Sequence, residues 1–181
     1  QLASEQYINF IDAAATGAMN GLQMVGAIGA MLLAFIALIA MLNGMLEAAG
    51  ALVGLEQLTL ERVLGGLLQP LAWALGVPWD EAQMAGSLIG QKFILNEFVA
   101  YVSYSEIADQ LSPHAQAIVI FALCGFANLS SIAILLGGLG AVAPSRRDDI
   151  SRYGMRALIA ASLSNLMSAA LAGFFLSLGG L

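Results

Sequence analysis

Phe93-Ile-Leu-Asn-Glu-Phe-Val-Ala-Tyr101 is an apolar run with two polar residues, Asn96 and Glu97, at its centre. A second polar island, Cys124-Gly-Phe-Ala-Asn-Leu-Ser-Ser131, interrupts another apolar run. A charged side chain at the centre of a membrane helix costs at least about 2.5 to 3.5 kcal/mol, so one that persists there usually lines an aqueous or substrate-filled cavity. The two islands together predict half of a solute-binding site.

The composition defines the class of protein around these islands. The chain has 181 residues, of which 60% are apolar and 10% are charged, which excludes an ordinary soluble domain. Only helices and closed barrels satisfy the backbone in lipid, and the apolar stretches here are longer than barrel strands and do not alternate. The sequence therefore predicts an all-α integral membrane protein. Its single cysteine, Cys124, allows no internal disulfide.

The basic residues predict the orientation of the chain. Four of the six lie close together, at Arg146, Arg147, Arg152 and Arg156. Cytoplasmic loops carry an excess of lysine and arginine, and anionic lipid attracts such clusters to the same side. We expect this loop to be cytoplasmic, in a multi-pass protein of the cytoplasmic (inner or plasma) membrane.

The first part of the chain predicts one membrane span between two interfacial helices. Residues 1–17 place apolar side chains on one side of a helix, which indicates an interfacial helix. Residues 22–47 contain one long apolar run, and about 20 residues suffice to cross a bilayer. Residues 58–76 begin with Thr-Leu-Glu-Arg and carry tryptophan at their end, which indicates a second interfacial helix.

The second part of the chain predicts interrupted helices. Residues 80–110 form two arms of about a dozen residues that meet at Asn96 and Glu97, which predicts a re-entrant helical hairpin. Residues 115–143 predict a transmembrane helix broken at the second island, and residues 150–181 predict a last span. We expect the polar side chains of that span, Asn165 among them, to join helices. Lys92 can pair with an acid across the hairpin or extend toward the interface, and we expect the second as the default for a lone lysine near a helix end. This order is typical of one structural repeat of a secondary transporter.

Two stretches carry a specific resemblance. Gly90-Gln-Lys-Phe-Ile-Leu-Asn-Glu-Phe-Val-Ala-Tyr101 and Ala122-Leu-Cys-Gly-Phe-Ala-Asn-Leu-Ser-Ser-Ile132 resemble the signature stretches in the C-terminal half of concentrative nucleoside transporters. The resemblance covers essentially the whole chain, residues 1–181. It implies that Glu97, Asn128 and Ser131 bind the sugar hydroxyls and that Phe126 packs against the ribose.

The resemblance also implies the wider function and the partners. It implies cation-coupled uptake of nucleosides by alternating access, with sodium or a proton as the coupling ion, no cofactor, and a homotrimer in the lipid bilayer. The family's N-terminal half carries a Gly-Gln-Thr/Ser-Glu hairpin that contacts the base and, in the sodium-coupled members, supplies most of the cation ligands. This chain contains no such stretch, and we interpret Gly90-Gln-Lys-Phe93 as part of its own hairpin. The N-terminal half of the transporter is therefore an expected partner, and no metal ligand is expected here.

Other classes of function are open to Glu97. A proton-conducting or channel-like membrane subunit would use this carboxylate as a relay, and a purely structural carboxylate would be held by the amides of its own hairpin. An enzyme is not expected, because the chain has no Ser/His pair and no metal-spaced His/Cys set near the islands. No basic aromatic surface indicates nucleic acid.

Overall fold

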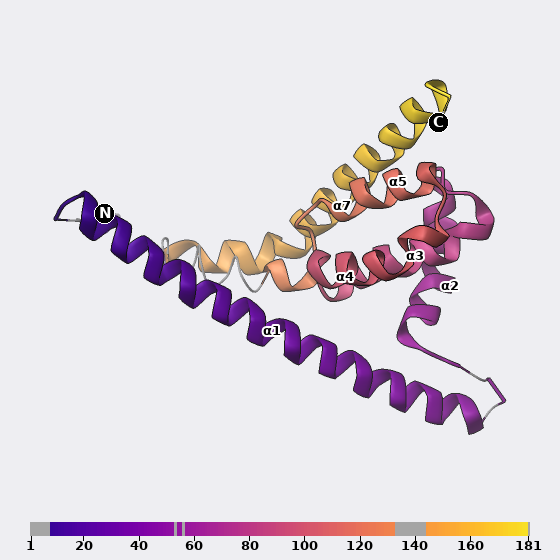
Figure 1. The fold of residues 1–181 in the computed structure, drawn as a ribbon, viewed down its shortest axis with the longest axis horizontal. Coiled ribbons are helices and arrows are strands. Elements are labelled where there is room, and N and C mark those ends of the chain that lie inside the picture. Colours follow the sequence, from indigo (N-terminus) through magenta and orange to yellow (C-terminus); the bar gives the residue numbers. More distant parts are fainter. Residues whose placement is uncertain (1–7, 53, 56, 133–143, 181) are drawn as a thin grey trace. The chain divides into compact units, whose positions relative to one another are not determined.

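The fold is helical throughout the part of the chain that the structure describes. The computed structural model describes residues 8–52, 54–55, 57–132 and 144–180, and no strand occurs among them (Figure 1). The predicted all-helical class is confirmed. The chain divides into two compact units, Gln1–Met41 and Leu42–Leu181.

Helix α1 (Phe10–Leu52) is a single helix of 43 residues. Asn9 precedes it, and the Asn9 side-chain oxygen accepts a 2.9 Å hydrogen bond from the Asp12 N–H. The helix continues through residues 18–21, so the predicted boundary between an interfacial helix and a separate span is wrong. Glycines lie on both sides of that boundary, but a glycine costs only about 1 kcal/mol relative to alanine, which does not end a long helix. Residues 1–7 of the predicted first helix lie outside the described residues.

A side chain near the end of α1 holds the start of helix α2 (Leu60–Ala74). The Asn43 side-chain oxygen accepts the Leu60 N–H at 2.7 Å, and the Asn43 amide donates to both carboxylate oxygens of Glu61 at 3.0 and 3.3 Å. Thr59 caps the same end, because its hydroxyl accepts the Arg62 N–H at 3.2 Å. The start of α2 is therefore fixed by two different parts of the chain.

Glycines bring α2 and helix α3 (Trp79–Ile94) into backbone contact. A Cβ atom at Gly65 would lie 2.7 Å from the carbonyl oxygen of Gln83, and one at Gly86 would lie 2.8 Å from the carbonyl carbon of Leu68. Both positions exclude any side chain at this separation, because the groups they would meet are backbone. The two helices therefore pack with their backbones in contact at these glycines.

Helices α3 and α4 (Glu97–Ile107) form a helical hairpin. Only Leu95 and Asn96 separate them, and the Ser103 hydroxyl donates a 2.7 Å hydrogen bond to the Gln91 side-chain oxygen on the opposite arm. A short turn, η1 (Ala108–Gln110), follows α4. The hairpin covers the predicted segment 80–110 as a helical element.

The chain then enters a helix that is interrupted. Helix α5 (Pro113–Leu123) begins at Ser112, whose hydroxyl accepts the Ala115 N–H at 3.2 Å. Residues 124–128 are not helical, and helical structure resumes at 129–132. Residues 133–143 of the predicted broken segment lie outside the described residues.

The last helix lies alongside α5. After a short turn, η2 (Pro144–Arg146), helix α7 (Arg147–Leu178) runs beside α5 (Figure 1). Among the described residues, one helical stretch, Ser151–Leu178, is long and apolar enough to cross a bilayer. Large apolar side chains on it are open to the surroundings, with Phe174 and Phe175 57% and 65% exposed. Such a surface fits lipid or a further protein segment better than water.

Candidate functional site

The first polar island lies at the N-terminal end of α4. Asn96 has an extended backbone, and its side-chain oxygen accepts the Val99 N–H at 2.9 Å, so Asn96 is the N-cap. Glu97 is the first residue of the helix. The N-terminal end of a helix carries a partial positive charge, which stabilises a carboxylate placed there. The fold therefore places the Glu97 carboxyl group at the tip of the hairpin and at the start of a helix.

The second island lies at the interruption after α5 and is also built as a helix start. The Asn128 side-chain oxygen accepts the Ser131 N–H at 2.8 Å, and the Ser131 hydroxyl donates to the Asn128 carbonyl at 2.6 Å. Asn128 is fully buried and Ser131 is 7% exposed. Both residues thus have a structural role in starting the helical segment 129–132.

The two islands meet. The Asn128 amide donates a 2.8 Å hydrogen bond to one carboxylate oxygen of Glu97, and the Ser130 hydroxyl donates to the Leu95 carbonyl at 3.4 Å. Two helix N-terminal ends therefore converge on one carboxylate. Of the predicted site residues, the structure brings together Glu97, Asn128 and Ser131, with Ser131 in contact with Asn128 and Asn128 in contact with Glu97.

Phe126 lies apart from this contact chain. Its ring is 60% exposed, and with Ser131 it lines a hollow of about 180 Å³ whose far wall is formed by Gly154 to Ala161 of α7. Glu97 does not line this hollow. The structure therefore joins Phe126 to the other predicted residues through Ser131 alone.

The convergent groups suit a polyhydroxyl ligand. Among the described residues Glu97 accepts a hydrogen bond from Asn128 at Oε2. A carboxylate has about four acceptor positions, so the remaining ones can receive hydroxyl donors. The Asn128 amide and the Ser130 and Ser131 hydroxyls next to it supply both donors and acceptors.

The opposite end of the interruption contains a group that the sequence prediction missed. Lys92 was expected to extend toward the interface, and it is instead fully buried. Its ammonium donates to the Ala122 carbonyl at 2.6 Å and to the side-chain oxygen of Asn165. The expectation is wrong because the last carbonyls of α5 lie within reach of Lys92, and a helix end needs such donors. The one signal in the sequence was the placement of a lysine four residues before the hairpin tip.

Two more side chains complete this end. The Asn165 amide donates to the Phe121 carbonyl at 2.9 Å, and the Tyr101 hydroxyl donates to the Ile120 carbonyl at 3.1 Å. The predicted role of Asn165 in joining helices is confirmed. Three consecutive carbonyls of α5 are thus each paired with a side chain from a different helix.

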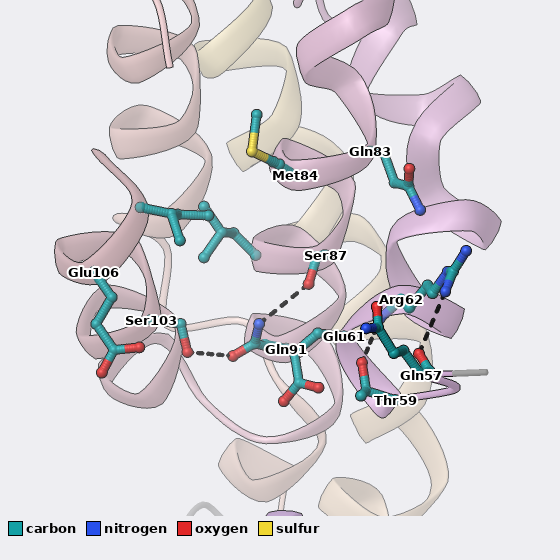
Figure 2. Close-up of a pocket in the computed structure, with 12 residues that line it drawn as sticks. Gln57, Thr59, Glu61, Arg62, Gln83, Met84, Ser87, Gln91, Ser103 and Glu106 are labelled. Atoms are coloured by element: carbon teal, nitrogen blue, oxygen red, sulfur yellow. Dashed lines mark hydrogen bonds between the residues drawn. The ribbon is translucent and has the colours of Figure 1, made fainter. Parts of the chain in front are cut away.

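A separate polar pocket lies on another side of the hairpin. It has a volume of about 700 Å³ and is lined by α2, α3 and α4 (Figure 2). Gln91 crosses its floor, because its side chain donates to the Ser87 hydroxyl at 3.3 Å and accepts from the Ser103 hydroxyl at 2.7 Å. Glu61 and Glu106 also line the pocket. None of the predicted site residues lines it.

Comparison with known proteins assigns the family. A sequence model described as "Na+ dependent nucleoside transporter C-terminus" matches residues 1–173. The chain belongs to this family. The family consists of transporters and not of enzymes, and its members are membrane proteins.

Individual members resemble the chain over almost its whole length. It is 56% identical to the "uncharacterized transporter YutK" of Bacillus subtilis, over 93% of this chain and 42% of that protein. It is 51% identical to the "putative nucleoside permease NupX" of Escherichia coli, over 94% of this chain and 42% of that protein. The structure of CNTnw in an inward-facing substrate-bound state matches with a TM-score of 0.93 and 54% identity, over 98% of this chain and 44% of that one. The chain spans about two fifths of the length of these relatives.

Proposed function

We propose that the chain supplies the ribose-binding half of a nucleoside transporter that takes up nucleosides together with a cation, sodium or a proton. The observation that carries the proposal is the 2.8 Å hydrogen bond between Asn128 and Glu97, which joins the hairpin tip to the interrupted helix. Family membership supports the transported class of solute. The sugar is the part of a nucleoside that this chemistry recognises.

A ribose offers two neighbouring hydroxyls, and an ionised carboxylate accepts from both at once. In the proposed complex Glu97 accepts from the hydroxyls, and Asn128 and Ser131 bind the same sugar. The exposed ring of Phe126 packs against the ribose face. A ligand without the hydroxyls would leave these groups unpaired, at about 1 to 3 kcal/mol for each.

The lengths of the helices support the proposed membrane arrangement. Helices α3 and α4 have 16 and 11 residues, or about 24 and 17 Å, which is less than the roughly 30 Å of a hydrocarbon core. We assign them to a re-entrant hairpin, α5 and the segment after it to a broken span, α1 and α7 to full spans, and α2 to the interface. The hairpin and the broken helix then move as a unit to expose the site alternately on the two sides.

The other functions of the proposed transporter require an N-terminal half and further copies of the protein. In the proposed transporter an N-terminal half binds the base and supplies most of the ligands of the coupling cation, and three copies form a homotrimer. The arginine cluster, which the structure places in η2 and the first part of α7 and not in a loop, faces the cytoplasm. The protein lies in the cytoplasmic membrane as a multi-pass protein.

Nucleoside uptake by the full-length protein that contains this chain tests the proposal. We expect saturable uptake of uridine, binding of 2′- and 3′-deoxyuridine that is weaker by roughly tenfold or more, and a loss of roughly 100-fold in uridine binding for Glu97→Gln. Gln keeps the size of the side chain and removes its charge, and Glu106→Gln, a surface acid of α4, is the matched control. Wild-type uptake by Glu97→Gln would remove this residue from the site. A flux that does not saturate and does not respond to nucleosides would favour the channel-like alternative.

A further inference from the structure

The Lys92 ammonium occupies a site built from oxygen atoms. It contacts the carbonyl oxygen of Ala122, which belongs to the last turn of α5, and the side-chain oxygen of Asn165 on α7. The orientation of the Asn165 amide is fixed, because its nitrogen donates to the Phe121 carbonyl. Both atoms that face Lys92 are therefore acceptors. Lys92 itself has no exposed surface.

This kind of environment is one that cations occupy in transporters. Where membrane helices are broken, the carbonyls at the C-terminal end of the first half coordinate coupling cations. The same end carries the negative partial charge of the helix. The lysine ammonium is a compact point charge with three donors, so it matches a site of this type.

We propose that Lys92 is a tethered cation, which holds the place of an exchangeable monovalent cation at the C-terminal end of the broken helix. The ammonium joins α3 to α5 and α7 at the point where the helix is interrupted. It thereby positions Asn128, five residues beyond the end of α5, against Glu97 on the hairpin. Lys92 acts through these residues and is a positioning residue. This half of the site then needs no bound ion of its own.

A lysine that only fills space would make the same contacts, and the two roles differ in one measurable way. A tethered cation can be replaced by a free one of similar size. A packing role cannot be restored by a salt. The deciding experiment therefore removes the ammonium and adds small cations from solution.

The experiment uses the full-length protein with Lys92→Met, which keeps the length of the side chain and removes its charge. Thermal unfolding and uridine binding are measured in choline chloride and then in ammonium, sodium or potassium chloride. We expect Lys92→Met to unfold at a lower temperature and to bind uridine roughly tenfold more weakly in choline. Ammonium should recover most of both losses, with sodium or potassium recovering less. In the wild type and in Lys92→Arg, the unfolding temperature and uridine binding should change with the salt only through the coupling ion, and equally in both proteins.

The unfolding temperature is measured without nucleoside, so it separates this inference from the proposed function on which its binding readout rests. A wild type that binds no uridine contradicts the proposed function, and ammonium-dependent stability of Lys92→Met still supports the tethered cation. Losses that no cation recovers, or no losses at all, overturn the tethered cation. If Lys92→Met does not fold in any salt, Lys92→Gln decides, because it keeps an N–H donor without the charge. Recovery of Lys92→Gln by ammonium supports the proposal, and its indifference to every cation overturns it.

Discussion

The interruption at residues 124–128 lies between the C-terminal end of α5 and the N-terminal end of the helical residues 129–132. These two helix ends are stabilised in opposite ways. At the start of the helical residues 129–132, Asn128 caps the helix and donates to the carboxylate of Glu97, which begins a second helix, the one that Asn96 caps. At the C-terminal end of α5, three carbonyl oxygens each accept a hydrogen bond from a side chain, namely that of Lys92, Tyr101 or Asn165. Each end receives the sign of charge that the helix dipole favours.

The difference lies in what each end leaves for a ligand. The carbonyls of the C-terminal end are paired within the chain, whereas the carboxylate at the N-terminal end keeps acceptor positions beyond its bond to Asn128. The C-terminal end of α5 therefore stabilises the fold, and the N-terminal end beside Glu97 is available to bind a ligand. Substitutions at the two ends should separate into effects on stability and effects on nucleoside binding.

The largest effect is expected at Asn128, where one side chain both caps a helix and contacts Glu97. Asn128→Leu removes both functions, and we expect a loss of roughly 100-fold or more in uridine binding. Asn128→Asp keeps the oxygen that accepts the Ser131 N–H and replaces the donor to Glu97 by a second acid. Binding titrations of the two variants should show losses for both, with the unfolding temperature better preserved in Asn128→Asp. Tight binding by Asn128→Asp would show that the cap alone matters.

A smaller effect on binding and a clear one on stability are expected at Asn165. Asn165→Leu leaves the Phe121 carbonyl and one donor of Lys92 without partners, at about 1 to 3 kcal/mol each. Thermal unfolding in detergent should show the loss. Ser168→Ala is the control on the same helix, because within the described part of the chain its hydroxyl donates to the Ser164 carbonyl of its own helix and to no other helix. Equal unfolding temperatures for the two variants would contradict the role of Asn165.

A loss of stability without a loss of binding is expected at Asn43. Asn43→Leu removes the side-chain bonds to Leu60 and Glu61 at the start of α2, far along the chain from the interruption. We expect a cost of about 1 to 2 kcal/mol, as for the loss of a helix cap. Uridine affinity, measured on the folded variant, should stay within a factor of about two. A large change in affinity would mean that α2 contributes to the site.

The smallest effect is expected at Ser103. Ser103→Ala removes one hydrogen bond between the two arms of the hairpin, to Gln91, at about 0.5 to 1.5 kcal/mol. This bond lies in the polar pocket of about 700 Å³, which has room for a water molecule to replace the hydroxyl (Figure 2). Denaturation and binding curves close to those of the wild type would confirm that the contacts at the hairpin tip, rather than those along its arms, set the site.

The sequence predicted the parts of the site in which polar residues stand within apolar runs. Glu97 and Asn128 are polar residues in apolar runs, and a bilayer penalises such residues unless they meet each other or a ligand. Their hydrogen bond agrees with that reasoning. The interruption at residues 124–128 was predicted in the same way, from glycine, asparagine and serine in a long apolar stretch.

The parts that could not be predicted depend on which partner a residue meets. A lysine in an amphipathic arm reaches either water or a buried acceptor, and only the positions of Ala122 and Asn165 decide between them. Asn165 lies 73 residues further along the chain than Lys92, so no local pattern connects the two. The sequence also failed to predict that α1 continues past residue 17. Glycine destabilises a helix only slightly, so a glycine in the sequence is compatible with a helix interior as well as with a helix end.

The three donors at the end of α5 also constrain how the protein is made. Lys92 and Tyr101 are synthesised before α5, but Asn165 belongs to α7, which leaves the ribosome after α5. Until α7 is inserted, the Phe121 carbonyl has to be satisfied by water or by the insertion machinery. In a nascent chain that stalls before residue 165, the end of α5 therefore lacks one of its three side-chain donors, and it acquires its final geometry only after α7 has been synthesised and inserted.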